Sequence, residues 1–214
     1  MTATVDPGFW DRLAEDYSKK PVDDPAAWQA KLRIHKGLYD GTERVLDIGC
    51  GTGSLCLELA PHVAEAHGLD LSAEMVRIAR GKAEAAGAEH VHFTQGVLED
   101  LDEPDASYDS VSAYSILHLV PDVDATLRRL FDLCRPGGSF VSSTVVLGDS
   151  WVPYGVLLTV MRWVGKAPYV RRLRRAELVE RIEAAGFVDV EVKDVGAKGD
   201  ILYVVARKPQ ARVG

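Results

Sequence analysis

The chain has few cysteines, no excess of basic residues and no basic, apolar leader, and each shortage excludes a class of protein. Its three cysteines, Cys50, Cys56 and Cys134, are scattered and lack partners at metal-ligand spacing, so neither a disulfide framework nor a metal site is expected. A net charge of −7 argues against nucleic-acid binding, which requires a basic surface. The missing leader indicates a cytoplasmic protein without a secretory signal.

Alternating strand and helix patterns indicate a single α/β domain. With 214 residues and a 47% hydrophobic composition, the chain can bury one sizeable core. Strands are predicted at 44–48, 65–69, 91–94, 109–113 and 138–146, and a helical pattern follows each of the first four, as at 73–86 and 123–133. The β-rich runs at 188–195 and 201–207 then read as a hairpin. We therefore predict a doubly wound, mostly parallel sheet that ends in an antiparallel hairpin.

A glycine-rich turn follows the first predicted strand and carries the strongest functional signal. Val45, Leu46 and Ile48 form the short apolar run of a strand that is covered on both faces. The glycines within 49–53 permit positive φ angles and let main-chain N–H groups approach a ligand. Because a helix is expected to begin near Leu55, the unpaired amides and the helix dipole favour a carboxylate or phosphate at this turn.

Two acids and one missing glycine indicate which of two classes of ligand the turn binds. A dinucleotide fingerprint requires Gly-x-Gly-x-x-Gly, and counting from Gly49 its last glycine position is occupied by Ser54. Asp47, just before the turn, would repel a pyrophosphate and attract an ammonium or a sulfonium. Asp70 ends the second predicted strand, where its carboxylate can accept hydrogen bonds from both hydroxyls of a ribose.

The order of these motifs resembles that of the class I S-adenosylmethionine-dependent methyltransferases. The resemblance covers about residues 41–208 and rests on the glycine motif at 45–53, on Asp70, on the loop at 95–100, on the segment 108–118 and on the turn at 135–138. It implies a seven-stranded, Rossmann-like methyltransferase fold and the in-line transfer of a methyl group from S-adenosyl-L-methionine, which leaves S-adenosyl-L-homocysteine. Relatives often carry Gly-Asp before the adenine loop. Here Gly96-Val97 leaves open whether Glu99, Asp100 or main-chain groups contact the adenine edge.

The resemblance also implies which residues bind the cofactor. The glycine turn is expected to hold the methionine end, Asp70 the ribose and the loop at 95–100 the adenine. The full implied set is Asp47, Gly49, Cys50, Gly51, Asp70, Leu71, Met75, Val97, Leu98, Glu99, Ala113 and Tyr114.

Two residues are candidates for a direct role in methyl transfer. His118 follows the fourth strand, where side chains face the methyl group in the family fold, and it can act as a general base if the acceptor must lose a proton. The alternative is a histidine that shapes the pocket or caps a helix. Tyr17 resembles the tyrosine by which many relatives close an N-terminal helix over the cofactor. Its alternative is an ordinary residue of an amphipathic helix.

Tryptophans mark the expected acceptor site. All four lie outside the glycine-and-acid core, either in an N-terminal helical cap at 1–40 or, within the methyltransferase domain at 41–214, in an insertion at 147–175. An aromatic-lined pocket would suit a small aromatic, apolar or amphipathic acceptor, or a cationic amine through cation–π contact. The alternatives are tryptophans that only anchor helix packing and, for the insertion, a core helix, an acceptor lid or a membrane-surface helix. The pocket is predicted to contain Trp10, Tyr114, His118, Trp151, Tyr154 and Trp163.

Other functions and partners remain open at this point. An NAD(P)-dependent oxidoreductase on a similar sheet and a non-catalytic cofactor-binding module are the alternatives to a small-molecule methyltransferase. The broken dinucleotide spacing counts against the first and the intact cofactor motifs against the second. The arginines within 171–175 either grip an anionic acceptor or headgroup or form a solvated helix start. No transmembrane segment is expected, because the apolar run in the insertion is too short. The acceptor atom and the choice between monomer and homodimer are not determined.

Overall fold

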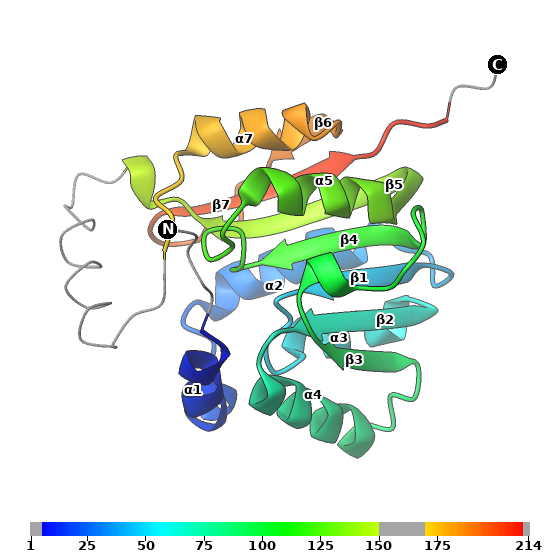
Figure 1. Ribbon diagram of the computed structural model, residues 1–214, viewed down its shortest axis with the longest axis vertical. Coiled ribbons are helices and arrows are strands. Elements are labelled where there is room, and N and C mark those ends of the chain that lie inside the picture. Colours follow the sequence, from blue (N-terminus) through cyan, green and yellow to red (C-terminus); the bar gives the residue numbers. More distant parts are fainter. Residues whose placement is uncertain (1–5, 150–169, 212–214) are drawn as a thin grey trace.

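The protein is built around one seven-stranded sheet with the strand order β3-β2-β1-β4-β5-β7-β6 (Figure 1). The computed structural model describes residues 6–149 and 170–211. Strands β1 to β5 pair in parallel, whereas β7 runs antiparallel to both β5 and β6. The predicted doubly wound, mostly parallel fold with a terminal antiparallel hairpin is therefore confirmed. The strands are β1 Arg44–Ile48, β2 Glu65–Asp70, β3 Val91–Gln95, β4 Tyr108–Tyr114, β5 Cys134–Val145, β6 Val188–Val192 and β7 Ile201–Arg207.

Six α-helices flank the sheet in the described residues, and side-chain caps mark where several of them begin. Asp24 and Asp122 accept hydrogen bonds from main-chain N–H groups in the first turns of α2 and α5, and Ser72 does the same for α4. The predicted N-terminal helical segment is divided into α1 and α2, because Asp24 and Pro25 start a new helix there. The helices are α1 Pro7–Lys19, α2 Pro25–Lys36, α3 Ser54–Leu59, α4 Ala73–Ala85, α5 Val123–Leu133 and α7 Arg175–Ala184.

The helices cover the sheet from both sides. Apolar residues of α5 and α7 pack on one face, in a cluster that includes Leu127 and Ile182. Helices α2, α3 and α4 pack on the other face, through residues such as Leu32, Leu59 and Val76. Helix α1 lies beside α4 rather than over the middle of the sheet (Figure 1). Side chains that alternate along one strand therefore reach opposite layers of the fold.

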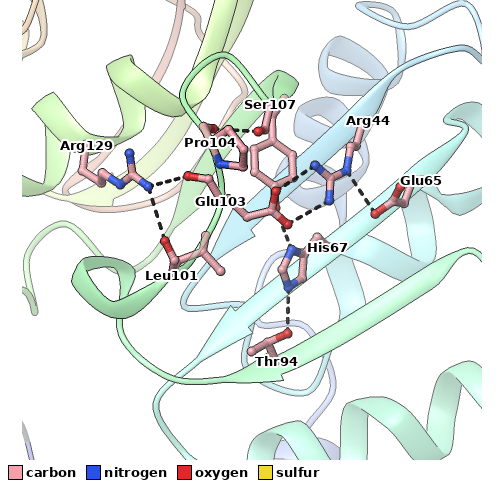
Figure 2. A network of polar contacts seen from close by, with 10 residues as sticks. Arg44, Glu65, His67, Thr94, Leu101, Glu103, Pro104, Ser107 and Arg129 are labelled. Atoms are coloured by element: carbon pink, nitrogen blue, oxygen red, sulfur yellow. Dashed lines mark hydrogen bonds and ion pairs between the residues drawn. The ribbon is translucent and has the colours of Figure 1, made fainter.

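The connection between β3 and β4 differs from the prediction. A helical pattern was expected after each of the first four strands, but only the 3₁₀ turn η2, Leu98–Asp100, lies there. The segment that follows is held by side chains instead (Figure 2). Arg44 donates to both carboxylate oxygens of Glu103, at 2.9 and 3.1 Å, and Arg129 donates to the main-chain oxygens of Leu101 and Glu103. This acid-rich segment contains Pro104 and has no apolar helical period, so it cannot form a buried helix.

The predicted insertion at 147–175 is described only at its two ends. The 3₁₀ turn η3, Leu147–Asp149, is tied to the start of α7, because Arg175 donates its main-chain N–H to the Asp149 carboxylate at 2.7 Å. Trp151, Tyr154 and Trp163 lie outside the described residues. Among the helices of 6–149 and 170–211, none is both long and apolar enough to cross a bilayer.

Candidate active site

The glycine turn at the carboxyl end of β1 is shaped by packing on two sides and open on the third. Gly49, Gly51 and Gly53 all have positive φ angles, of 64°, 54° and 77°. A Cβ atom at Gly49 would lie 2.7 Å from the Ile116 side chain, and one at Gly53 would lie 2.5 Å from the Phe93 ring. At Gly51 the nearest atom would be a ring carbon of Tyr17 at 3.8 Å. The turn therefore leaves room for a ligand only beside Gly51.

Asp47 places a buried carboxyl group directly below this turn. Its side chain is 3% exposed, and its Oδ1 accepts a hydrogen bond of 2.7 Å from the Ser112 hydroxyl on β4. Burial raises the pKa of Asp47 to about 7, the nearby Asp70 adds to that rise, and the Ser112 hydrogen bond opposes it. Because the charged form is disfavoured by desolvation, a cationic ligand at the turn would stabilise it. This fits the expected preference for an ammonium or sulfonium.

Asp70 links the glycine turn to the start of α4. Its two oxygens accept hydrogen bonds from the main-chain N–H groups of Gly51, at 2.8 Å, and Ser72, at 2.9 Å. Burial nevertheless raises its pKa above the usual value. An ionised carboxylate has about four lone-pair positions, so these two bonds leave capacity for two ligand hydroxyls. The role of Asp70 at the ribose remains a prediction that this geometry accommodates.

The residues expected around the adenine lie at the ends of β2 and β3. The main-chain N–H of Gly96 donates to the Asp70 main-chain oxygen at 2.9 Å, which holds the two strand ends together. Leu98 and Met75 are buried, and Leu71 is partly buried. Val97 is 40% exposed, and Glu99 next to it is exposed as well. An apolar surface with a neighbouring acid is therefore available for a flat, polar-edged ring.

Helix α1 lies near the carboxyl ends of these strands because it docks on the start of α4. The Asp11 carboxylate accepts hydrogen bonds from the Ser72 hydroxyl at 2.6 Å and from the Glu74 main-chain N–H at 3.2 Å. This contact places an acid at the positive end of the α4 dipole and Tyr17 over Gly51. The role of Tyr17 in closing over the cofactor stays a prediction, for which a position beside Gly51 is suitable. The role of Asp11 could not be predicted, because one acid on an exposed helix face has no distinguishing spacing.

The two other candidates at this edge, Tyr114 and Ala113, end β4 and point to opposite faces of the sheet. Ala113 belongs to the core beneath α5, while Tyr114 faces α2. The Tyr114 ring stacks on His35 at 5.6 Å and meets Trp28 edge-on at 6.2 Å. The predicted pocket residue Trp10 instead packs edge-on against Phe9, within α1. Of the two tryptophans in the described residues, Trp28 is thus the one that contacts Tyr114, although it was not among the predicted pocket residues.

His118 lies just beyond β4, largely withdrawn from solvent. Its side chain is 8% exposed, and its Nδ1 is buried without a hydrogen-bond partner in the described part of the chain. Burial lowers the pKa of His118 to about 4, so the ring is neutral near pH 7. A neutral imidazole can accept a proton, but one with this pKa is a weak base. Both readings of His118, as base and as pocket wall, are compatible with its position.

A buried polar cluster beneath α2 was missed by the sequence analysis. It joins Lys31 and His35 of α2 to Tyr114 of β4, Ser143 of β5 and Tyr203 of β7. These residues are too far apart in the chain to form a recognisable motif. The available signal was the pair Lys31 and His35, four residues apart on the face of α2 that also buries Ala27 and Leu32. Polar residues on a buried helix face require partners, which points to a site on the opposing strands.

Comparisons with known proteins agree with this geometry. A family model described as a methyltransferase domain matches residues 40–180. A demethylmenaquinone methyltransferase from Geobacillus kaustophilus is 31% identical over 183 residues, which cover 76% of each chain. A ubiquinone biosynthesis O-methyltransferase from Azorhizobium caulinodans is 30% identical over 195 residues, 83% of this chain and 74% of the relative.

A solved structure supports the same fold. Phosphoethanolamine N-methyltransferase 2 from Haemonchus contortus, in complex with S-adenosyl-L-methionine, superposes with a TM-score of 0.71 at 19% identity, over 86% of this chain and 53% of that one. At this identity the likeness concerns the fold alone. The sequence relatives and the family model, which matches well over half of the residues, decide the class. This chain belongs to the class I S-adenosylmethionine-dependent methyltransferase family.

Proposed function

We propose that the protein methylates a small, hydroxylated aromatic ring of the kind found in quinols. The observation that carries this proposal is the match, over most of the chain, to relatives whose names place them in menaquinone and ubiquinone biosynthesis. The aromatic side chains at the end of β4 support it, because Trp28 and Tyr114 meet edge-on where the acceptor is expected. Aromatic surfaces of this kind favour a planar apolar ligand.

The residues that we assign to the cofactor occupy one part of the carboxyl edge of the sheet, which is the edge where its parallel strands end. S-adenosyl-L-methionine supplies the methyl group as an electrophilic sulfonium. In our proposal Asp47 and the turn at Gly51 hold its amino-acid end, Asp70 binds the ribose, and Val97 contacts the adenine face. Two features favour this assignment: the raised pKa of Asp47, which a cation would offset, and the exposed apolar surface of Val97. Since these residues lie in or near the carboxyl ends of β1, β2 and β3, the acceptor is assigned to the remaining side, at β4 and β5.

The approach to that side passes the aromatic residues of α2. An open cleft of about 340 Å³ is lined by Val22, Trp28, Ser54, Leu57 and Glu58, next to the start of α3. Trp28 forms its wall and also contacts Tyr114. An apolar tail or ring edge could rest in this cleft while the reacting ring lies at the end of β4. We assign the cleft to the apolar part of an amphipathic acceptor.

The chain's own contribution to the chemistry is alignment and proton removal. Well-oriented reactants can lower a barrier by roughly 7–11 kcal/mol, so positioning dominates an in-line displacement. A hydroxyl acceptor must also lose its proton, and a positioned base adds a factor of about 10² to 10⁴. We assign that base to His118, which is neutral near pH 7 and follows β4.

A panel of acceptors tests the function. Formation of S-adenosyl-L-homocysteine is measured with 1,4-naphthoquinol, catechol and phosphoethanolamine as acceptors. The proposal expects turnover of the hydroxylated rings and none of phosphoethanolamine, the acceptor in the name of the structural neighbour. Turnover of the amine alone, or of no ring compound, would contradict it.

A further inference from the structure

Lys31 places a buried ammonium group at the acceptor side of the carboxyl edge. The residue is 9% exposed, and its Nζ donates a hydrogen bond of 2.9 Å to the Ser143 hydroxyl. Ser143 lies near the end of β5, directly opposite Tyr114 in the β4–β5 pairing. The charge of Lys31 is therefore fixed above the last residues of β4 and β5.

This ammonium has no counterion. In residues 6–149 and 170–211, Lys31 forms no ion pair; burial lowers the pKa of its ammonium, and the charge of Asp24 opposes that shift without pairing with it. The rest of the sequence, 1–5, 150–169 and 212–214, contains neither Asp nor Glu. An ammonium has three donor hydrogens, and among the described residues Ser143 is the one hydrogen-bond partner of Lys31. A charge withdrawn from water without a partner is unfavourable, and such groups concentrate at functional sites.

The hydroxyl groups of the two neighbouring tyrosines cannot serve a ligand as donors. Tyr203 donates to the main-chain oxygen of Lys31 at 3.1 Å, and Tyr114 donates to the Tyr203 hydroxyl at 3.0 Å. A carbonyl oxygen can only accept, so the hydrogens of both tyrosines are committed in this direction. The contact of 3.2 Å between His35 Nδ1 and the Tyr114 hydroxyl then requires His35 to donate. Of the groups in this cluster, Lys31 is thus the one that offers a ligand a charged donor, and the Ser143 hydroxyl, which accepts from Lys31, is a neutral donor beside it.

The strand order places Lys31 away from the expected cofactor. Asp47, Asp70 and Val97 follow or end β1, β2 and β3, whereas Lys31 lies over β5, on the far side of β4. With neighbouring strands about 4.8 Å apart, β1 and β5 are separated by roughly 10 Å. In an in-line displacement the acceptor approaches the methyl group from the side opposite the leaving sulfur. An acceptor over β4 would have its polar group within reach of β5.

We propose that Lys31 binds the anionic oxygen of the acceptor, a phenolate formed when the ring hydroxyl loses its proton. The inference deepens the proposed function and rests on it. The ammonium stabilises the phenolate and so lowers the pKa of the bound hydroxyl. The proton passes to solvent or to His118, the oxygen–methyl bond forms as the sulfur–methyl bond breaks, and the electron pair remains on sulfur. Lys31 would then select acceptors that carry an acidic hydroxyl.

A coloured phenol tests this role without turnover. 4-Nitrocatechol changes its absorbance on ionisation, so its pKa can be read while it is bound to the protein with S-adenosyl-L-homocysteine. In the wild type we expect the bound probe to ionise about one pH unit or more below the free probe, as beside an opposite charge. Lys31→Met should abolish that shift. The control Lys36→Met removes the same charge from α2, but from a lysine paired with Glu58, and should behave as wild type.

Two further readouts separate the alternatives. Lys31→Met should lower kcat/KM for catechol by about tenfold or more, as for a lost hydrogen bond to a charged group, and Lys31→Arg should restore part of it. The affinity of Lys31→Met for S-adenosyl-L-homocysteine should stay within about threefold of wild type. A tenfold loss of that affinity would assign Lys31 to the cofactor carboxylate and overturn the inference. So would a wild-type probe without a shift, or an equal shift in Lys31→Met.

Folding and the proposed function are controlled separately. Lys31→Met removes an unpaired buried charge, so its melting temperature should equal or exceed that of wild type. A large drop would indicate a structural role and contradict the inference. Lys31→Gln, which keeps a donor for Ser143 but has no charge, should lose the shift as Lys31→Met does. If wild type shifts the probe yet methylates no ring compound, the proposed function fails while the anion site stands.

Discussion

The carboxyl edge of the sheet is built differently at β1, β2 and β3 than at β4 and β5. At β1, β2 and β3 it is formed by a glycine turn, which Asp70 braces, and by the side chains of Asp47, Asp70 and Val97. At β4 and β5 it consists of side chains, and the residues that meet there, Lys31, Tyr114 and Tyr203, come from distant parts of the chain. Glycines at positive φ tolerate few substitutions, whereas the side chains at β4 and β5 can be changed residue by residue. The first suits a constant cofactor and the second a variable acceptor.

The largest expected effect comes from filling the glycine turn. Gly49→Ala puts a Cβ atom 2.7 Å from Ile116 at a φ of 64°, so both overpacking and backbone strain apply. We expect a loss of about 2–5 kcal/mol in the free energy of unfolding, measured by denaturant titration. Gly51→Ala carries similar strain but no clash, since its nearest neighbour lies 3.8 Å away. It should cost less stability and still weaken S-adenosyl-L-homocysteine binding. Equal stability loss in both variants would remove the distinction between packed and open glycines.

Removing the acid of β2 should have the next largest effect. Asp70→Ala deletes the acceptor for two main-chain N–H groups and the predicted ribose contact. Calorimetry should show S-adenosyl-L-homocysteine binding weakened by about 1.5–3 kcal/mol. Glu84→Ala, at an exposed acid of α4 to which no role is assigned, serves as the control and should change binding little. Unchanged affinity in Asp70→Ala would refute its role.

His118 is the corresponding test on the acceptor side. If it removes the proton, His118→Gln should lower kcat by about tenfold or more and flatten the acidic limb of the pH profile. Cofactor affinity should hardly change, because His118 lies beyond β4. His92→Gln, at an exposed histidine of β3, is the matched control. A near-normal rate in His118→Gln would assign the residue to pocket shape.

The pH dependence of stability should separate Asp47 from the histidines. Burial raises the pKa of Asp47 to about 7, so the folded state binds this proton more tightly than the unfolded chain does. The stabilisation that the bound proton gives is therefore lost as pH rises from about 4 to 7. Burial lowers the pKa of His35 to about 3 and of His118 to about 4, so these residues destabilise the fold as pH falls below about 6.5. Asp47→Asn should therefore gain on wild type, by about 1 kcal/mol or more, between pH 5 and pH 8. The measurement is unfolding at several pH values. A constant difference would contradict the assignment.

The smallest effect is expected where α1 docks. Asp11→Ala removes the acceptor for the Ser72 hydroxyl and the Glu74 main-chain N–H at the start of α4. Loss of such a contact should cost about 0.5–2 kcal/mol of stability. Because Asp11 also holds Tyr17 over Gly51, activity should fall more than cofactor affinity. Asp16→Ala, at an exposed acid of the same helix, should have neither effect.

The difference between the two sides of the carboxyl edge also explains which parts of the site could be predicted from the sequence. Positions such as Gly51 and Asp70 are readable, because a strand, a turn and an acid must follow one another at close spacing. The missing helix after β3 could have been anticipated from the acids and Pro104, which break the apolar period. The contact of Lys31 with Ser143 spans 112 residues and carries no local pattern. Only the strand order brings such residues together.

The central claim is the division of the edge into a cofactor side and an acceptor side. Its most direct test is calorimetric titration of S-adenosyl-L-homocysteine into wild type, Asp70→Ala and Tyr203→Phe. The Tyr203 change removes the hydroxyl that bridges Tyr114 to the main-chain oxygen of Lys31 and leaves the β1 turn untouched. We predict a loss of about tenfold or more in Asp70→Ala and a change of no more than about threefold in Tyr203→Phe. Comparable losses in both variants would contradict the division.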